Sequence, residues 1–495
     1  MSVLTGHLSH TINPEDMLTL VIDQGSHASR MAVFTAADEL IQLESINIST
    51  HTDTDNHYEQ DANEILHSVT SLLEKLPADQ IHNIRGCGIC TQRSSIIAWS
   101  RSTGEALSTA ISWRDLRNQS LVKRLFKTKS SVRRISGLPL TAHYSASKIR
   151  WLLENNDRVK QAELNRDLCI SPIASFLLFH LLKEQPCLID HSNAQRSQLF
   201  DISTLNWSEE LLALFQINQS CLPECRPVIH HYGYLKHMDI PITVVCGDQN
   251  AALHAYPPLT SNNALVNIGT GAFVLSKSDI HQQPSALLCS IASSQNTQQA
   301  IQVEYITEGT VNGAGAALDW AQNKLPYENL FNSLPEWLDK ISNPPVFINT
   351  VSGLGSPWWC DAGPPVFLEE SQNLRSTGIE DRYVAIIESI VFLIFNNLEQ
   401  LKTPPRTLYL SGGLSQLNGL CQKLADLSRS EVLRFSEKEA SAYGCACLVK
   451  QYFRDNQTHC LTADIESKFT ASENSKLINR YQQFVGELNK RCNSN

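Results

Sequence analysis

Two aspartates stand at the ends of apolar runs, where a side chain can meet a ligand. Asp23 follows "LTLVI" and Asp248 follows "ITVVCG". Short, β-branched apolar runs predict strands covered on both faces, and open α/β sheets place their ligand chemistry at the carboxyl ends of such strands. Helix capping is the ordinary alternative for Asp248, because an Ala/Leu-rich helical stretch begins at Asn250. Taken alone, the stretch "ITVVCGDQNAALHA" favours the cap.

Three turns that contain glycine follow predicted strands, and their backbone could bind phosphate. They are Gly25 in "DQGSH", the "GTG" of 269–271 and the glycine pair of "SGG" at 411–413. A tight glycine turn directs several backbone N–H groups to one point, which suits phosphate oxygens. No G-x-x-x-x-G-K-[ST] occurs, so a bound nucleotide would not be held as in a P-loop. One such turn is usually an ordinary hairpin, whereas three of them with two strand-end aspartates favour phosphate chemistry.

The elements that must position these residues follow one plan twice. Residues 18–45 predict three strands with a turn through Gly25, and a helix is expected over about 61–75. A second strand, glycine turn and strand occupy 263–278. Between the two blocks, "HAYPPLTSNN" has the Pro-Pro pair and polar residues typical of a domain border. We therefore expect an α/β protein with two domains, 1–256 and 257–495.

Charge and hydropathy argue against two classes of partner. The 495 residues carry a formal net charge of −10, and no basic stripe or polybasic run occurs. Nucleic acids and membrane surfaces are therefore not expected partners. The N-terminus does not resemble a signal peptide, and no apolar run approaches the roughly 20 residues of a membrane span. We expect a cytoplasmic globular protein.

The fourteen cysteines predict buried structural thiols. Cys87 and Cys90 form a C-x-x-C on a predicted strand, where residues three apart face opposite ways, so a zinc site there is not expected. The other cysteines are scattered along the chain, as suits free thiols in a reducing compartment.

Ten segments in consistent order resemble the FGGY family of carbohydrate kinases and, within it, the glycerol kinases. "VIDQGSHASRMAVF" is similar to the family's opening D-Q-G-T-T-S-S-R, and the stretch from "CTQRSS" to "SWRDLR" resembles its N-Q-R-E and W-x-D-x-R. "HYSASKIRWLLEN" resembles the K-x-x-W signature and "DHSNAQRSQLF" the S-N-A-S-R stretch. "GDQNAAL", "GTGAF", "EGTVNGAGAALDW", "SGLGSPWW" and "SGGLSQLN" then follow in the family's order.

The resemblance implies a fold, a reaction and two cofactors. Members fold as two actin-like (ribonuclease H-like) ATPase domains, each with a mixed five-stranded sheet, with a ligand cleft between them and ATP bound against the second. Asp248 aligns with the general base, which accepts the proton of the attacking hydroxyl during phosphoryl transfer. Asp23 aligns with the carboxylate near Mg²⁺, a cation that prefers oxygen ligands. The implied substrate is a small polyol or sugar, and a homodimer and a homotetramer are both compatible with the resemblance.

Further site residues follow from the aligned motifs. Arg93 would donate to substrate hydroxyls, while the rings of Trp113 and Phe273 would face the carbon skeleton, although core packing is the ordinary role of such rings. The implied substrate-binding residues are Arg93, Ser94, Trp113, His143, Asp248, Gln249 and Phe273. The implied nucleotide-binding residues are Gly25, Ser26, His27, Arg30, Gly269, Thr270, Gly271, Gly315, Asp319, Gly412 and Gly413.

Five residues depart from the glycerol kinase pattern. Ser94 stands where those enzymes carry a glutamate that binds glycerol, and His143 stands where they carry a tyrosine. His27 replaces a threonine of the first turn, and Leu417 and Asp319 replace an Asn and a Gln near adenine. The pocket thereby loses a charged acceptor, and an aspartate does not reproduce the two-sided hydrogen bonding of an amide. The departures predict a diverged member of the family.

Three functions are compatible with these residues. The first is an ATP-dependent kinase for glycerol or a related polyol or sugar, with a ketose such as xylulose or ribulose as the alternative substrate. The second is a kinase-like regulatory protein without turnover, which the departures near the nucleotide favour and the two aspartates oppose. The third is an actin- or chaperone-like ATPase, which would have no need of a polyol pocket.

Overall fold

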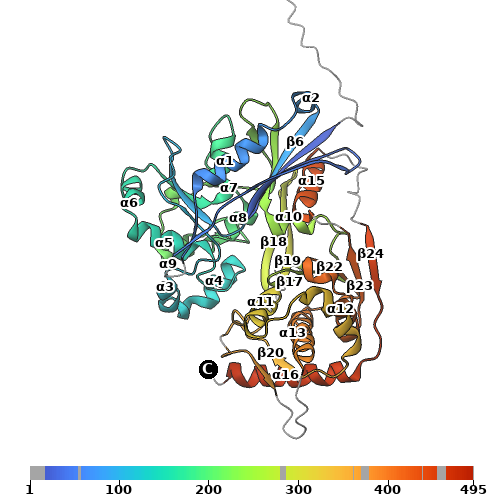
Figure 1. Cartoon of the computed structure of the whole chain (residues 1–495). Coiled ribbons are helices and arrows are strands. Elements are labelled where there is room, and N and C mark those ends of the chain that lie inside the picture. Colours follow the sequence, from blue (N-terminus) through green and yellow to red (C-terminus); the bar gives the residue numbers. More distant parts are fainter. Residues whose placement is uncertain are drawn as a thin grey trace, which may run out of the picture. The chain divides into compact units, whose positions relative to one another are not determined.

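The computed structural model describes residues 17–53, 57–278, 286–360, 362–368, 378–436, 439–453 and 464–493. They form two compact units, which Figure 1 colours along the sequence. Unit 1 comprises residues 1–255, 291–303 and 439–462, and unit 2 comprises 256–290, 304–438 and 463–495. Each unit gathers discontinuous segments, so the single border near residue 257 stays a prediction.

The main sheet of unit 1 is mixed. Its strands, in spatial order, are β18 (Leu288–Asn296, from residue 291 on), β14 (Ile229–Tyr234), β15 (Pro241–Gly247), β6 (Ile84–Thr91), β1 (Leu18–Gln24), β2 (Ala28–Phe34) and β3 (Leu40–Asn47). The first three strands of the chain form the antiparallel meander that the sequence predicts. β1, β6 and β15 are parallel neighbours, so their carboxyl ends lie at the same edge.

Smaller sheets and short helices complete unit 1. A second sheet contains β4 (His51–Thr52), β5 (Tyr58–Gln60), β8 (Ala110–Ile111), β7 (Ile96–Ser100) and β9 (Leu168–Pro172). Two strand pairs join β10 (Leu188–Asp190) to β13 (Glu224–Arg226) and β11 (Phe200–Asp201) to β12 (Asn206–Trp207). The α-helices are α1 (Ala62–Leu73), α2 (Ala78–Ile81), α3 (Gln119–Arg124), α4 (Lys129–Ser136), α5 (Ser145–Asn155), α6 (Asp157–Leu164), α7 (Ile173–Leu181), α8 (His191–Gln195), α9 (Glu209–Phe215), α10 (Asp248–Leu253) and α15 (Ala440–Tyr452). Short 3₁₀ helices span Phe126–Thr128 and Gln219–Cys221.

Helices cover both faces of the main sheet of unit 1 (Figure 1). The predicted helix over about 61–75 is α1, which Asp61 begins by accepting a hydrogen bond from the Asn63 N–H. Its apolar face, including Ile65 and Val69, packs into one core with β1 and α7. On the other face, α15 contacts β1, β6 and β15 and lies against α10. The helix that Asp248 begins is therefore held by a neighbour from the far end of the chain.

The contact between α15 and α10 depends on a glycine. A Cβ atom on Gly444 would overlap the main-chain oxygen of Ala251. We expect Gly444→Ala to destabilise the protein by about 1–3 kcal/mol, because overpacking forces the backbone to shift. Gly486→Ala is the matched control, since Gly486 also lies in a helix but its added Cβ would meet no atom within 4 Å. The control should gain up to about 1 kcal/mol from helix propensity. Equal melting temperatures for the two variants would contradict this packing.

Unit 2 repeats the plan. Its main sheet contains, in spatial order, β24 (Ile465–Phe469), β23 (Glu431–Phe435), β22 (Thr407–Ser411), β16 (Asn263–Ile268), β17 (Ala272–Ser278) and β19 (Ile301–Val311, from residue 304 on). A separate pair joins β20 (Val346–Ile348) to β21 (Val366–Leu368). The helices are α11 (Gly315–Lys324), α12 (Leu330–Lys340), α13 (Ile379–Glu399), α14 (Asn418–Ser428), α16 (Ser475–Asn493) and the 3₁₀ helix η5 (Gly413–Gln416). An antiparallel set, β16–β17–β19, again continues into parallel strands, β22 and β23. The duplicated plan predicted from the two blocks is confirmed.

A buried ion cluster joins three helices of unit 2. Glu388 of the apolar helix α13 is 1% exposed. It accepts hydrogen bonds from Arg480 Nε and Nη2, both at 2.7 Å, and from Lys423 Nζ at 3.0 Å. The two cations come from α16 and α14, so the charges pair inside the core and fix the helices to one another.

The cysteines differ in one respect from the prediction. Among the described residues, nine are buried free cysteines, and Cys187 and Cys225 are half-buried. Cys360 and Cys492 are joined in a disulfide within unit 2, which corrects the expectation that all are thiols. Cys460 lies outside the described residues.

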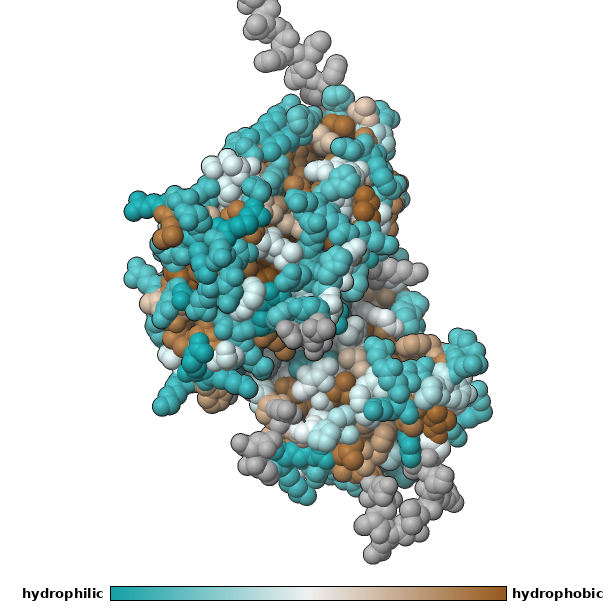
Figure 2. All heavy atoms as spheres, turned by 60° about the vertical axis from the view of Figure 1, so that its left-hand side comes forward, coloured by the Kyte–Doolittle hydropathy of each residue, from teal (hydrophilic) through white to brown (hydrophobic). Residues whose placement is uncertain are grey.

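The surface is mainly hydrophilic on the face that Figure 2 shows, with apolar residues in small groups. Scattered apolar groups of this kind are ordinary on a protein surface. Among the described helices, none combines the length and the apolar character that crossing a membrane requires.

Candidate active site

Asp23 and Asp248 lie at the same edge of the sheet of unit 1. Asp23 is the last residue but one of β1 and lies opposite Cys90 of the central strand β6. Cys90 in turn lies opposite Cys246 of β15, two residues before Asp248. The parallel register therefore brings the two aspartates, which the sequence places at strand ends, to neighbouring strands of the sheet.

Asp248 is not the N-cap of its helix. The cap residue is Gly247, and Asp248 is the first residue of α10. Its Oδ1 accepts a hydrogen bond from the Gln249 N–H at 2.7 Å, and its side chain remains 26% exposed. Ser192 Oγ, on α8, accepts the Gly247 N–H at 3.0 Å and so fixes the backbone just before the carboxylate. The carboxylate is thereby left partly exposed at the start of the helix.

Arg93 lies directly beside this carboxylate. Its Nε is 3.7 Å from Asp248 Oδ1, and its Nη1 donates to Asn250 Oδ1 at 3.3 Å. The side chain of Arg93 passes over Gly247, where a Cβ atom would lie 2.6 Å from Arg93 Cδ. Glycine at this position is thus required for close approach, and the arginine and the aspartate together offer a donor and an acceptor to a hydroxyl group.

The electrostatics of the two carboxyl groups favour proton and cation binding. Burial raises the pKa of Asp248, although Arg93 and Arg196 oppose the shift. Burial and the neighbouring Asp248 raise the pKa of Asp23 to about 7, although Arg30 opposes the shift from 3.7 Å. A raised pKa makes a carboxylate a better proton acceptor, and a bound cation would offset the cost of burying a negative charge at Asp23.

The carboxylate oxygens of Asp23 and Asp248 suit Mg²⁺, which prefers oxygen ligands and keeps several waters. Among the described residues, no group of three or more His, Cys, Asp or Glu side chains could hold a metal ion. Asp23 is the residue that would hold Mg²⁺, with water and phosphate oxygens as the other ligands.

Trp113 and His143 stand together in unit 1. Their ring centroids are 5.6 Å apart at an interplanar angle of 62°. Trp113 Nε1 donates to Ser26 Oγ at 2.9 Å, and the Trp113 N–H donates to Ser95 Oγ at 2.9 Å. The indole thus connects the predicted substrate pocket to the first glycine turn.

Ser94 has its hydroxyl group engaged with the backbone. The residue is 1% exposed and has φ of 65°, and its Oγ donates to the Arg196 oxygen at 3.3 Å. Ser145 Oγ donates to the Ser94 oxygen at 3.2 Å. The side chain that replaces the glutamate of glycerol kinases is therefore turned toward protein atoms.

The first glycine turn is organised by Gln92, a residue of the "CTQRSS" motif for which the sequence predicts no role. Its Nε2 donates to Gln60 Oε1 at 2.9 Å, to Gln24 Oε1 at 3.3 Å and to the Gly25 oxygen at 3.4 Å. The Gly25 N–H donates to the Ala28 oxygen at 2.9 Å, which closes the hairpin. The turn is therefore held in shape by hydrogen bonds among the protein's own residues.

The other predicted residues of the first turn differ in exposure. His27 is exposed at the tip of the hairpin. Arg30 is half-exposed and lies 3.7 Å from Asp23 and 3.8 Å from Glu439, measured between charged atoms. The arginine could contact an anion only by sharing its charge with these carboxylates.

The second and third glycine turns meet in unit 2. The Gly315 N–H donates to the Gly269 oxygen at 2.9 Å, and a Cβ atom on Gly315 would lie 2.8 Å from that oxygen. The Ala316 N–H donates to the Thr270 oxygen at 2.9 Å. Gly412 has φ of 88°, and its Cβ would lie 2.6 Å from the Ile268 oxygen. Helix α11 therefore packs on the 269–271 turn through Gly315, and the "SGG" turn packs through Gly412 on Ile268, the residue just before it.

The remaining predicted residues of unit 2 have different environments. Phe273 is half-buried on β17, and Gly413 begins η5 with no atom within 4 Å of an added Cβ. Asp319 is exposed on α11. Leu417 is 5% exposed and belongs to the apolar core. The leucine that replaces the family's Asn therefore contributes to core packing.

The family models agree with this arrangement. Residues 18–253 match the N-terminal domain of the FGGY family of carbohydrate kinases, and residues 264–449 match its C-terminal domain. The chain therefore belongs to the FGGY family of carbohydrate kinases, and it is an ATP-dependent carbohydrate or polyol kinase.

Curated relatives and solved structures are similar over nearly the whole chain. The glycerol kinase of Geobacter sp. (strain M21) is 31% identical over 444 residues, which are 87% of this chain and 89% of that protein. The glycerol kinase of Citrifermentans bemidjiense is 32% identical over 450 residues, with the same two shares. A crystal structure of Plasmodium falciparum glycerol kinase with ADP has a TM-score of 0.84 at 23% identity, covering 96% of this chain and 97% of that one. A xylulose kinase from Brucella ovis has a TM-score of 0.82 at 18% identity, covering 95% and 98%. The structures confirm the fold, two actin-like ATPase domains.

Proposed function

We propose that this enzyme transfers the γ-phosphoryl group of ATP to a hydroxyl group of glycerol or a related small polyol or sugar, with Asp248 as general base. The observation that carries the proposal is the pair formed by Asp248 and Arg93, 3.7 Å apart at a strand end beside Asp23. The names of the curated relatives support glycerol, whereas the solved structures include kinases of other carbohydrates.

The proposed mechanism divides three tasks among the residues of unit 1. Arg93 donates to a substrate hydroxyl and orients it toward Asp248, which accepts the proton as the oxygen attacks phosphorus. Asp23 would hold Mg²⁺ directly or through water, and the ion would supply positive charge against the phosphate oxygens. Trp113 faces the carbon skeleton, His143 contacts further hydroxyl groups of the substrate, and Gln249 lies next to the base. Because the enzyme needs only position and charge here, no covalent intermediate is required.

Nucleotide binding is proposed for the glycine turns. We assign substrate and base to residues 1–256 and nucleotide to residues 257–495. The first turn would contact phosphate oxygens from the substrate side, and the packed glycine turns of unit 2 would let a nucleotide approach the backbone closely.

The substrate is tested by a panel of polyols and ketoses of three to five carbons, assayed for ADP release against a blank without substrate. A single compound with the highest kcat/KM identifies the substrate class. ADP release that no compound stimulates would instead favour an ATPase. The absence of any ADP release or nucleotide turnover would favour a regulatory protein.

Position 94 decides whether glycerol is a good substrate. The pocket lacks the charged acceptor of glycerol kinases because residue 94 is a serine. Its Oγ is directed at the main-chain oxygen of Arg196. We expect wild-type protein to use glycerol poorly, and Ser94→Glu to raise kcat/KM for glycerol by roughly ten- to a hundred-fold. Ser94→Gln, of similar size but uncharged, should give little gain. If wild-type protein has an ordinary micromolar KM for glycerol and the glutamate adds nothing, the departure is neutral and glycerol is the substrate.

A further inference from the structure

Lys148 is a buried cation in contact with two of the proposed substrate-binding residues, and the proposed mechanism does not use it. It lies on α5 and is 0% exposed. Its Nζ donates to the main-chain oxygen of His143 at 2.7 Å and approaches that of Trp113 at 3.4 Å. These oxygens belong to the two residues whose rings stand 5.6 Å apart. One ammonium group therefore links the main-chain oxygen of His143 to that of Trp113.

We propose that Lys148 is a positioning residue that ties the backbone of Trp113 to that of His143 and so sets the spacing of the two rings that contact the substrate. The inference rests on the proposed function in one respect, that these rings face the polyol. The bridge itself is a property of unit 1 and exists without any ligand.

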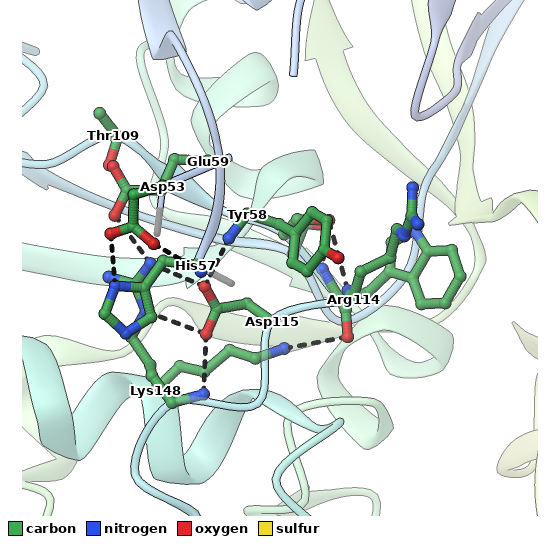
Figure 3. Close-up of polar contacts among 12 residues, drawn as sticks. Asp53, His57, Tyr58, Glu59, Thr109, Arg114, Asp115 and Lys148 are labelled. Carbon is green, nitrogen blue, oxygen red and sulfur yellow. Dashed lines mark hydrogen bonds and ion pairs between the residues drawn. The ribbon is translucent and has the colours of Figure 1, made fainter. Parts of the chain in front are cut away.

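The neighbouring charges do not account for a lysine at this place. Asp115 lies next to Lys148 (Figure 3), but its carboxylate is already paired. It accepts from Arg117 Nε at 2.9 Å, Arg117 Nη2 at 2.7 Å and the Tyr58 N–H at 2.8 Å. Arg117 is itself shared with Glu59 at 2.8 Å. Since a methionine would fill the same space without desolvating a charge, the two carbonyl oxygens explain the ammonium group.

Trp113 is held from three sides. Its N–H and its Nε1 reach Ser95 and Ser26, and its oxygen faces Lys148. Removing Lys148 would leave the indole attached to the first glycine turn while the link to His143 is lost. We therefore expect an effect on the pocket and little effect on the turn.

The bridge should respond to pH. Burial lowers the pKa of Lys148 to about 7, with Arg117 adding to the shift and Asp115 opposing it. Charged donors form stronger hydrogen bonds, so the bridge weakens as pH rises through about 7. Stability has the opposite trend. The folded pKa lies below the unfolded value, so the penalty of the buried charge is complete below about pH 7 and disappears toward pH 10.5. If Lys148 only supported the fold, affinity for the substrate would rise with pH in the same way as the stability of the protein.

Lys148→Met tests the bridge against Lys148→Gln, which keeps one donor group. In Lys148→Met, KM for the best polyol should rise about ten-fold at pH 6, with kcat and KM for ATP within about two-fold of wild type. KM for the polyol in Lys148→Gln should lie between the values for wild type and Lys148→Met. The ratio of the methionine variant's KM to that of wild type should fall toward one above pH 8. Lys423→Met, which removes another buried lysine but in unit 2, is the control and should leave KM for the polyol unchanged.

Hydrogen exchange of the ligand-free proteins gives a readout that needs no turnover. Peptides that cover residues 112–117 and 141–146 should exchange faster in Lys148→Met than in wild type or Lys423→Met. If wild-type protein phosphorylates no polyol, the proposed function fails. Hydrogen exchange alone still shows whether Lys148 links the backbone of Trp113 to that of His143. An active wild type, with KM and exchange unchanged in Lys148→Met, would overturn the inference. Should Lys148→Met not fold, KM for the polyol and hydrogen exchange are compared between wild type and Lys148→Gln across pH. Unchanged KM and exchange in Lys148→Gln would then overturn the inference.

Discussion

Asp248→Asn should lower kcat by about 10²–10⁴-fold while the protein stays folded. Asparagine has the same shape and can still accept the Gln249 N–H through its Oδ1, which in wild type forms a hydrogen bond of 2.7 Å. It cannot accept the proton of the attacking hydroxyl. Initial rates of ADP release with the best polyol measure the loss, and circular dichroism with a melting curve measures the fold.

Asp239→Asn is the matched control for this variant, because Asp239 pairs with Lys183 on the surface of unit 1 and should be neutral. KM for the polyol should change little in Asp248→Asn if Arg93 still orients the hydroxyl. Full activity in this variant, or unfolding, would contradict the role of general base.

Asp23→Asn should abolish Mg²⁺-dependent turnover, by roughly 10³-fold or more, since a metal ion supplies several kcal/mol of charge stabilisation. Polyol affinity should be nearly unchanged, because Arg93 and Trp113 are untouched. Calorimetric titration with Mg·ATP should show weaker binding. An unchanged affinity together with an unchanged rate would remove Asp23 from the metal site.

The same variant should be more stable than wild type when Mg²⁺ is absent. Asp23 is 5% exposed, and the nearby Asp248 disfavours its charge, so the neutral amide removes a cost. A higher melting temperature in EDTA, combined with lost activity, distinguishes a residue placed for function from one placed for stability. A lower melting temperature would indicate that Asp23 supports the fold.

The local elements could be predicted from the sequence because their signals are local. Short β-branched runs with glycine between them gave the hairpin of β1 and β2 and that of β16 and β17. The same signals placed Asp23 and Asp248 at strand ends, and the strand register adds that these ends are neighbours in one sheet. The N-cap was wrong as a first interpretation, because Gly247 takes that place.

Roles that depend on contacts distant in sequence could not be predicted. Lys148 meets the Trp113 oxygen across 35 residues, and Gln92 meets Gln60 across 32. Neither residue belongs to a periodic pattern that identifies its partner, and a lone lysine on a helix is ordinarily a surface group. The pairing of Cys360 with Cys492, 132 residues apart, likewise has no signature in the spacing.

The departures at the pocket show how a structure refines a motif. The sequence indicates that Ser94 replaces a glutamate, and the structure adds that its hydroxyl is directed at the Arg196 oxygen. The resemblance places Leu417 where an Asn lies near adenine, and the structure adds that its side chain belongs to the apolar core of unit 2. A substitution at a motif position can therefore serve packing, which only the fold reveals.

The central claim is that Asp248 accepts a proton from a substrate hydroxyl during phosphoryl transfer from ATP. Its most direct test is a single-turnover experiment with ATP labelled at the γ-phosphate, the best polyol of the panel and excess enzyme. Wild-type protein should move the label to the polyol with Mg²⁺ present, and Asp248→Asn should bind both substrates but move it at least about 10²-fold more slowly. Label that appears only as free phosphate, or transfer at the wild-type rate in Asp248→Asn, would contradict the account.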